Sequence, residues 1–168
     1  MLITFGGLPG TGKTTLARQL ARRLGAVYLR IDTIEHAIAA AEEVPVGEAG
    51  YRVGYAVAEE NLRLGQTVVA DCVNPLRITR EAWRTAAQRT GVAFVEVLVV
   101  CSDQAEHRHR IETRNLDITG PRLLIWQDVV TREFEPWDRE PIVIDTAGRT
   151  VEQSSAALQA ALSMQRRS

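Results

Sequence analysis

The strongest chemical signal in the sequence lies at residues 7–14, which read G-L-P-G-T-G-K-T and fit the pattern G-x-x-x-x-G-K-[ST]. The glycines allow the backbone to curl until successive N–H groups point at phosphate oxygens, and a following helix adds its positive end. We expect Lys13 to reach the outer phosphates of a nucleotide and the Thr14 hydroxyl to bind Mg²⁺. The residues expected to bind the nucleotide are Gly7, Gly10, Thr11, Gly12, Lys13, Thr14 and Thr15.

Lys13 is the only lysine in the chain, and the other residues among the 20 Lys plus Arg are all arginine. A compact ammonium group contacts phosphate as a point charge, and arginine is not an equivalent replacement in that task. The composition therefore favours phosphate binding over the alternative, a glycine-rich turn that binds no ligand.

The elements on either side of the loop give it the context that the pattern requires. Residues Leu2–Phe5 are a short apolar run with β-propensity, and after the loop Leu16, Leu20 and Leu24 recur at helical spacing. The loop therefore joins a buried strand to an amphipathic helix.

The whole chain fits a single domain over residues 1–168, since 168 residues with 45% hydrophobic content can bury a core without disulfides. Two cysteines favour a reduced compartment, and no stretch approaches the roughly 18 apolar residues of a membrane span. A net charge of −1 argues against a general nucleic-acid or anionic-membrane surface. We therefore expect a cytoplasmic protein with no general nucleic-acid binding and no membrane binding.

Strands and helices alternate along the remaining sequence. Further strands are expected at Val27–Ile31, Gln66–Asp71, Val92–Val100 and Pro141–Asp145. Helices are expected at Asp32–Glu42, Ala49–Leu64, 74–90, Asp103–Arg114 and Arg122–Phe134, with Ser102 as a cap and a terminal helix opened by the capping box Thr150–Gln153. This pattern predicts a five-stranded parallel α/β sheet with helices on both faces. Ligands bind such sheets at the carboxyl ends of the strands, where Asp32, Asp71, Asn74, Ser102, Asp103 and Asp145 are expected.

With the phosphate loop, the acid after the second strand, the stretch V-V-A-D-C-V-N-P and R-I-E-T-R before a short loop, the chain resembles the P-loop kinases. It is most similar to the AAA-domain kinase-like group that includes chloramphenicol phosphotransferase, zeta toxin and polynucleotide kinase. The resemblance implies a three-layer P-loop NTP hydrolase fold with strand order 2-3-1-4-5 and a lid at about 115–122. It also implies ATP and Mg²⁺ as cofactors, and transfer of the γ-phosphate to a hydroxyl of a small molecule.

The resemblance also suggests residue roles, each with a simpler alternative. Asp32 would accept the proton of the acceptor hydroxyl, or cap a helix with Glu35. Asp71 would hold Mg²⁺ directly or through water, or be a turn acid. Arg110 and Arg114 match paired lid arginines that clamp phosphates, although either could be a solvated side chain. Other ambiguous residues are Asn74 (acceptor contact or cap), His107 and His109 (not a metal site), and Trp126 and Trp137 (packing rather than stacking).

Three other functions were weighed. Asp145–Gly148 reproduces the D-x-x-G of GTPase switches, but it follows the last strand, where P-loop kinases border the adenine. A mechanical ATPase would need an added domain or a basic surface. A toxin-like kinase of a sugar nucleotide differs from the main hypothesis only in its substrate. The oligomeric state stays open.

Two further expectations depend on the resemblance. In the strand order 2-3-1-4-5 the first strand separates Cys72 from Cys101, so no intramolecular disulfide should form. Glu35 stands one turn after Asp32, where related kinases with anionic acceptors carry arginine. A carboxylate there would favour an uncharged or cationic acceptor, and Glu35→Arg should lower kcat/KM for the acceptor more than it affects KM for ATP.

Overall fold

The computed structural model describes residues 1–42, 46–113 and 125–165. Its centre is a five-stranded parallel sheet in the order β2-β3-β1-β4-β5. The strands are β1 (Leu2–Gly6), β2 (Val27–Arg30), β3 (Val68–Asp71), β4 (Phe94–Val100) and β5 (Ile142–Asp145). The predicted fold class and strand order are therefore confirmed.

Helices connect successive strands, as the alternating pattern predicts. They are α1 (Lys13–Leu24), α2 (Ile31–Glu42), α3 (Ala49–Arg63), α4 (Arg77–Thr90), α5 (Gln104–Thr113), α6 (Trp126–Val130) and α7 (Val151–Gln165). Gly25 and Gly91 end α1 and α4 in the left-handed conformation that favours glycine. The capping box at the start of α7 is present, because Thr150 N–H donates to Gln153 Oε1 and Gln153 N–H to Thr150 Oγ1.

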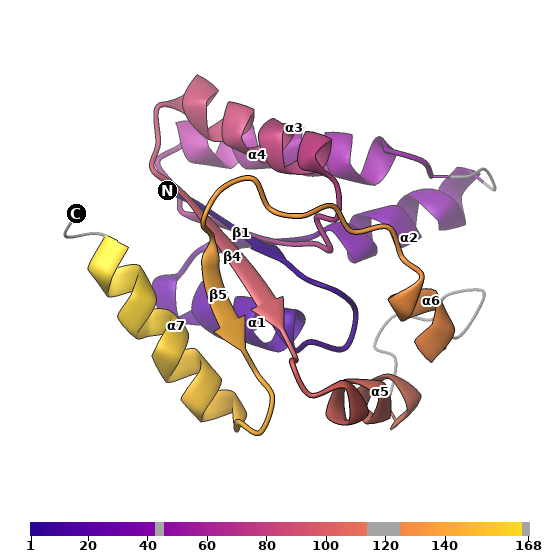
Figure 1. Cartoon of the computed structure of the whole chain (residues 1–168). Helices are drawn as coiled ribbons and strands as arrows, with labels where there is room; N and C mark the ends of the chain where they lie inside the picture. Colours follow the sequence, from indigo (N-terminus) through magenta and orange to yellow (C-terminus); the bar gives the residue numbers. More distant parts are fainter. Residues whose placement is uncertain (43–45, 114–124, 166–168) are drawn as a thin grey trace.

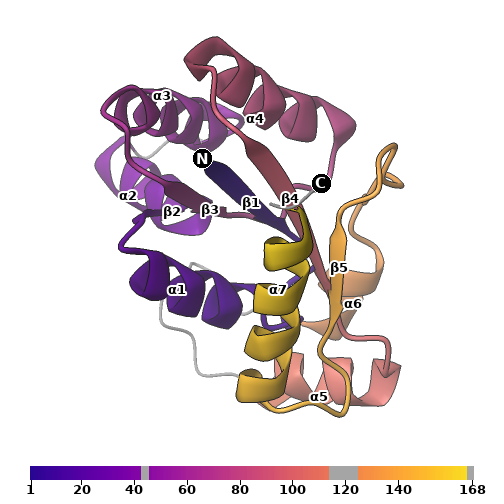
Figure 2. The same ribbon diagram turned by 90° about the vertical axis from the view of Figure 1, so that its left-hand side faces the viewer.

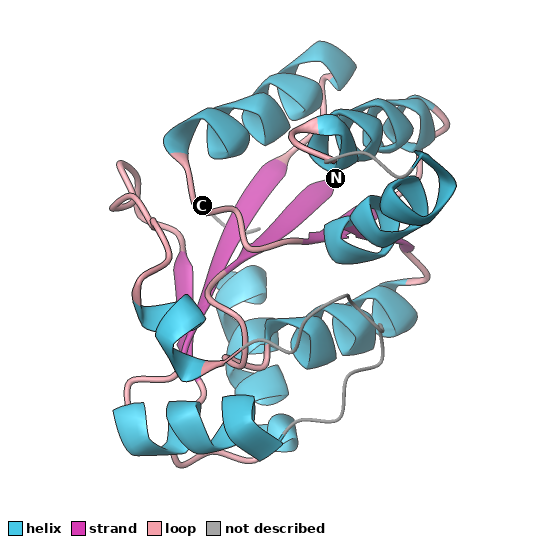
Figure 3. Ribbon diagram, turned by 90° about the vertical axis from the view of Figure 1, so that its right-hand side faces the viewer, coloured by secondary structure: helices cyan, strands magenta, loops and turns pink. Residues whose placement is uncertain are grey.

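Helices cover both faces of the central strands, and side-chain alternation divides the core into two (Figures 1 and 2). Along β3, Val69 joins the core beneath α1 and α7, whereas its neighbours Val68 and Ala70 join the core beneath α2, α3 and α4. Figure 3 shows the strands enclosed between these helical layers. A parallel sheet buried in this way requires strands that are apolar on both faces, which the sequence supplies.

The carboxyl ends of the strands lie at the edge of the sheet toward α5 and α6, which cover no sheet face (Figure 1). The phosphate loop, the start of α2, the β3–α4 connection and the loop after β5 all begin at this edge. The fold thus gathers at one end the residues that the sequence marks as polar strand termini.

Several predicted helix boundaries are wrong. Asn74 takes a left-handed conformation with φ 54°, so the chain turns before α4 begins at Arg77 rather than at 74. Helix α2 follows β2 directly at Ile31, which places Asp32 inside the first turn instead of at the cap. Ser102 does not cap α5; Asp103 does, accepting from Glu106 N–H at 2.9 Å. Helix α6 ends at Val130 rather than at the predicted Phe134, and the predicted start at Arg122 lies outside the described residues.

Cys72 and Cys101 are free thiols, as the strand order predicts. None of the helices in the described ranges combines the length and apolar character needed to span a membrane.

Candidate active site

The phosphate loop leaves β1 through a backbone that only glycine permits at its first position. Gly7 has φ 135°, and a Cβ there would lie 2.2 Å from Val99 O. Gly7 N–H donates to Val73 O at 3.0 Å, and Thr11 Oγ1 donates to Leu8 O at 2.9 Å. These contacts fix the loop between β3 and β4.

The loop ends at the N-terminus of α1, where backbone N–H groups and the helix dipole meet. Gly12 is the N-cap with φ 91°, and no side chain in the described part of the chain caps this helix end. Lys13 is the first helical residue and is only 6% exposed. A helix N-terminus without a side-chain cap, followed by a buried lysine, is suited to binding an anion such as phosphate.

A cavity of about 290 Å³ lies beside the loop, between α1, α5 and the segment that joins β5 to α7. Its walls are Gly10, Gly12, Thr15, Leu16, Arg110, Thr146, Arg149, Thr150, Val151 and Ser154. The predicted loop residues Gly10, Gly12 and Thr15 thus border one cavity with the segment after the last strand. The predicted adenine-bordering segment Asp145–Gly148 includes Thr146, whereas Arg149 lies just beyond it and was not predicted.

Arg110 is held in the wall of this cavity by the loop after β5. Its guanidinium donates to Thr146 Oγ1 at 2.8 Å and to Thr146 O at 3.1 Å, and it pairs with Glu106 at 2.6 Å. The Gly148 N–H, and then Arg110, lower the pKa of Glu106. Thr146 Oγ1 in turn lies 2.9 Å from Thr11 O in the phosphate loop. Arg110 is therefore oriented toward the β5–α7 side of the phosphate loop.

His107 supports the phosphate loop from α5, a role that the sequence did not reveal. Its Nε2 lies 2.7 Å from Pro9 O, and because a carbonyl only accepts, Nε2–H is the donor. The ring is buried and packs edge-on against Trp126, with centroids 5.2 Å apart. In the same helix Ile111 packs so close to Gly10 that a Cβ there would lie 2.6 Å from Ile111 Cδ1.

Replacing His107 by phenylalanine is expected to weaken ATP binding by about 2- to 10-fold, the worth of one net hydrogen bond. The aromatic packing on Trp126 survives, so the melting temperature should change little. Titration of a fluorescent ATP analogue measures the effect. His109→Phe is the matched control, because His109 is exposed on another face of α5. Equal affinities of the two variants would contradict the assigned role.

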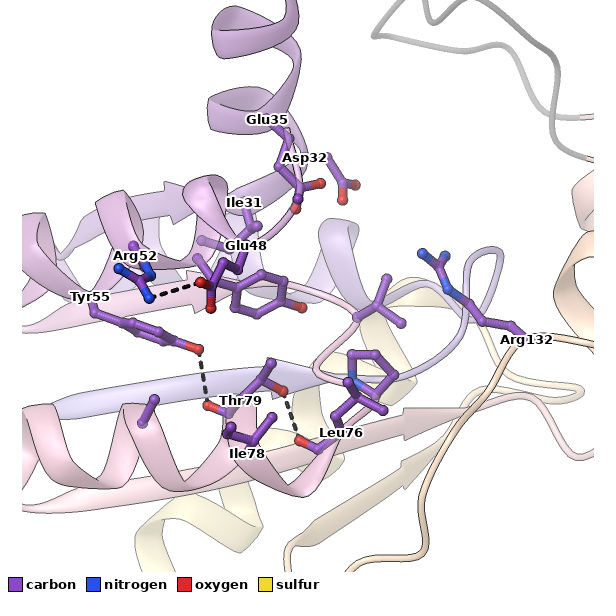
Figure 4. Close-up of a pocket in the computed structure, with 15 residues that line it drawn as sticks. Ile31, Asp32, Glu35, Glu48, Arg52, Tyr55, Leu76, Ile78, Thr79 and Arg132 are labelled. Atoms are coloured by element: carbon purple, nitrogen blue, oxygen red, sulfur yellow. Dashed lines mark hydrogen bonds and ion pairs between the residues drawn. The ribbon is translucent and has the colours of Figure 1, made fainter. Parts of the chain in front are cut away.

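A second and larger cavity, of about 430 Å³, lies between α2, α3 and α4 (Figure 4). Val73, whose carbonyl accepts from Gly7 N–H, lies in its wall, so this cavity adjoins the phosphate loop from the other side. Asp32 lines it, and the Asp32 side chain is 43% exposed. Arg30 holds one Asp32 oxygen at 3.6 Å. Asp32 is thus oriented toward a space that a substrate can enter.

Lys13, Asp32 and Asp71 come from three different elements, and the charge of each affects the pKa of the buried Cys72 thiol. Burial, and then the Asp71 carboxylate, raise the pKa of Cys72, while Lys13 opposes and Asp32 reinforces this shift. The charges of all three residues therefore influence this thiol.

Asp71 ends β3 in the position expected of a residue that helps to bind magnesium. It is 1% exposed, its Oδ2 accepts from Tyr28 O–H at 2.7 Å, and Arg30 lies 4.0 Å away. Its Oδ1 has no hydrogen-bond partner among the described residues. No group of three or more His, Cys, Asp or Glu side chains in the described ranges could hold a metal alone. A magnesium ion would therefore need phosphate oxygens or water besides Thr14 and Asp71.

Asp145 has a structural role. The D-x-x-G pattern that begins at Asp145 therefore gives little support to the GTPase hypothesis. Its carboxylate accepts from Ser102 N–H and Ala147 N–H, both at 3.0 Å, and from Ser102 Oγ–H at 2.5 Å. These bonds tie the end of β4 to the loop after β5. Both Asp145 oxygens therefore accept hydrogen bonds from groups of the protein itself.

Asp145→Asn is expected to lower the melting temperature by about 3 °C at pH 7, because it weakens charge-assisted hydrogen bonds. The Ser102 hydroxyl, and then the Ala147 N–H, hold the pKa of Asp145 below its ordinary 3.8. A lowered folded-state pKa contributes stability that is present above pH 3.8 and is lost as the pH falls through the folded value. Melting curves from pH 3 to 8 should show the difference shrinking at the acidic end; a constant difference would refute this assignment.

Asn74 and the tryptophans belong to the frame of the site. Asn74 N–H donates to Tyr51 Oη at 3.0 Å, and its side chain is fully buried. Arg80, also fully buried, donates to the Pro136 carbonyl at 2.9 Å and lies over Trp137 at 4.9 Å. Trp137 is therefore a packing residue, as predicted, and Trp126 is one as well because it packs against His107. The predicted Arg114 and the predicted lid at 115–122 lie outside the described residues.

A loop that fits the phosphate-binding pattern, a 2-3-1-4-5 sheet and cavities at the carboxyl edge define a P-loop NTP hydrolase fold. The protein-family comparison matches residues 2–125 to the AAA domain family, and the chain belongs to that family. A search among curated proteins found no match to the sequence.

Solved structures share this architecture over nearly the whole chain. A gluconokinase from Sinorhizobium meliloti 1021 is 16% identical with a TM-score of 0.70, covering 96% of this chain and 91% of that one. A sugar kinase from Janibacter sp. HTCC2649 is 18% identical with a TM-score of 0.72, covering 96% and 94%. The Mycobacterium tuberculosis APS kinase CysC in complex with AMPPNP and APS is 19% identical with a TM-score of 0.62, covering 96% of each. At these identities the similarity establishes the fold.

Proposed function

We propose that the protein is an ATP-dependent kinase that transfers the γ-phosphate to a hydroxyl group of a small molecule. The observation that carries this proposal is the pair of cavities on the two sides of the phosphate loop, with Asp32 lining the larger one. A switch or a mechanical ATPase needs one nucleotide site, whereas a phosphotransferase needs a second compartment for its acceptor. The similarity to kinase structures supports this proposal.

The smaller cavity is the proposed adenosine site. Its walls join the phosphate loop to the segment after β5, so a nucleotide bound at Lys13 would extend its base toward Thr146 and Arg149. Arg110 would then contact the nucleoside side rather than clamp the γ-phosphate, since Thr146 and Glu106 fix its guanidinium. A planar guanidinium is well suited to stacking on a base.

Thr14 and Asp71 are the residues that would hold magnesium in this proposal. The Oδ1 of buried Asp71, which has no hydrogen-bond partner among the described residues, would accept from a water molecule on the ion, and the hydroxyl of Thr14 would be a ligand. When bound, the ion would neutralise charge on the transferred phosphoryl group. Removal of Mg²⁺ by a chelator should abolish activity.

Asp32 is the proposed general base. In the larger cavity its carboxylate can accept the proton of an acceptor hydroxyl, while the hydroxyl oxygen attacks the γ-phosphorus. Lys13 and the N–H groups of the loop would hold the phosphates and stabilise the developing charge. ADP is the leaving group.

An ADP-release screen with ATP and Mg²⁺ tests the function, using sugars, nucleosides, aminoglycosides and phenicols as acceptors. We expect at least one acceptor to stimulate ADP release in proportion to a phosphorylated product seen by mass spectrometry. Absence of ATP binding, measured by calorimetry, would overturn the proposal. A toxin-like kinase of a sugar nucleotide is disfavoured because Asp32 and Glu35 would repel the diphosphate of such an acceptor.

A further inference from the structure

The walls of the larger cavity are mostly apolar. Its apolar and aromatic lining residues are Ile31, Tyr51, Tyr55, Val73, Pro75, Leu76, Ile78 and Ala82. A polyol placed against such walls would leave hydroxyl groups without hydrogen-bond partners, at a considerable cost. The shape and chemistry of the walls instead favour an acceptor with an apolar body.

Tyr51, Tyr55 and Thr79 each use the side-chain oxygen in a hydrogen bond within the protein. Tyr55 O–H donates to Thr79 O at 3.3 Å, and Thr79 Oγ1 donates to Leu76 O at 2.7 Å. Tyr51 Oη accepts from Asn74 N–H at 3.0 Å. The tyrosines therefore present mainly their ring faces and edges to the cavity.

Two carboxylates, Asp32 and Glu35, lie together on the opposite side, one helical turn apart on α2 (Figure 4). Glu35 lies directly against α3, because a Cβ on Gly50 would be 2.2 Å from Glu35 Cγ. The absence of a side chain at Gly50 thus allows Glu35 to extend over the cavity.

The positive charges around the cavity do not offset these carboxylates fully. Arg52 is paired with Glu48 at 2.8 Å, and Arg132 lies across the opening. Arg30 lies 3.6 Å from Asp32 but also 4.0 Å from Asp71, so its charge is shared between two carboxylates. Burial, and then Asp32, raise the pKa of Glu35, whereas Arg132 lowers it. A cationic ligand group near Glu35 would relieve this unfavourable environment.

We propose that the acceptor is an amphipathic amino alcohol, with an apolar body against Tyr51, Tyr55 and the 73–78 wall, a protonated amine at Glu35 and its hydroxyl at Asp32. This inference rests on the proposed function. In the transfer step the acceptor oxygen bonds to the γ-phosphorus, its proton passes to Asp32, and the bond from that phosphorus to the β–γ bridging oxygen breaks. The leaving oxygen takes the bonding electrons into ADP.

Binding of three compounds with one aromatic body tests the inference without requiring catalysis. Calorimetry on the full chain saturated with ADP and Mg²⁺ compares 2-amino-1-phenylethanol, its neutral N-acetyl derivative and anionic mandelate. We expect the amine to bind at least about tenfold more tightly than mandelate. Equal affinities for the amine and mandelate, or binding of gluconate in preference to all three, would overturn the inference.

Variants assign the preference to Glu35. Glu35→Gln should weaken amine binding about tenfold and leave the N-acetyl compound within about twofold, since only the charge is lost. Gly50→Ala should act in the same direction by displacing the Glu35 side chain, although alanine favours the helix. Glu60→Gln, an exposed glutamate of the same helix as Gly50, is the control. Amine affinity that is unchanged in Glu35→Gln would refute the assignment.

The outcomes separate this inference from the proposed function. If the amine binds as expected but is never phosphorylated under ATP and Mg²⁺, the binding inference stands and the kinase function fails. If the protein phosphorylates gluconate or another anionic sugar and rejects the amine, the kinase function stands and the inference fails.

Discussion

Replacing Lys13 by alanine is expected to lower kcat for phosphoryl transfer by about 10³-fold, because the variant loses the charge that stabilises the transferred phosphoryl group. Lys13 is the only lysine of the chain and is buried as the first residue of α1. Lys13→Arg should therefore also lose most activity, since a planar guanidinium does not reproduce a compact ammonium.

The measurement is steady-state ADP release with the best acceptor from the screen, together with melting curves. Arg22→Ala is the control, because Arg22 is an exposed residue in the last turn of the same helix. We expect the control to retain kcat and all three variants to melt cooperatively. A Lys13→Ala protein that folds and keeps full activity would disprove the assigned site.

Asp32→Asn is expected to lower kcat by about 10²- to 10⁴-fold, the usual contribution of a general base. Asparagine preserves the size of the side chain and cannot take the proton of the acceptor. The KM for ATP should stay nearly constant, because Asp32 lines the larger cavity and not the one beside Gly10 and Gly12.

The pH dependence separates a catalytic role of Asp32 from a structural one. In the unmodified protein kcat should fall at low pH as the base becomes protonated, whereas the small residual rate of Asp32→Asn should lack this limb. Asp138→Asn, which removes a carboxylate paired with Arg77 at 3.2 Å outside both cavities, controls for a general charge effect. An acidic limb that persists unchanged in Asp32→Asn would assign it to another group.

The sequence by itself determined the phosphate loop and the strand–helix alternation, because both depend on local chemistry. The glycines, the lysine and the apolar strand ahead of them are properties of a short segment, so they can be recognised from the sequence of that segment alone. The strand order followed from the resemblance to known kinases and was confirmed by the pairing of β3 with β1.

Some local expectations failed where longer-range contacts competed with them. Asn74–Pro75 reads as a helix start, yet Asn74 N–H is taken by Tyr51 from α3, and Arg80 binds the carbonyl of Pro75 at 3.2 Å. Ser102 reads as a cap, yet Asp145 from β5 takes its hydroxyl. Partners distant in the sequence decided both cases.

The residues that line the two cavities are set by contacts between elements that are far apart in the sequence. His107 meets Pro9 across 98 positions, and Arg110 meets Thr146 across 36, so no local spacing could reveal either contact. The apolar wall of the larger cavity comes from α3, α4 and the β3–α4 connection, whose residues read individually as ordinary core. Glu35 faces that wall only because Gly50, from another helix, leaves room for it. Packing between separate elements sets such features, and a pattern read along one element does not contain them.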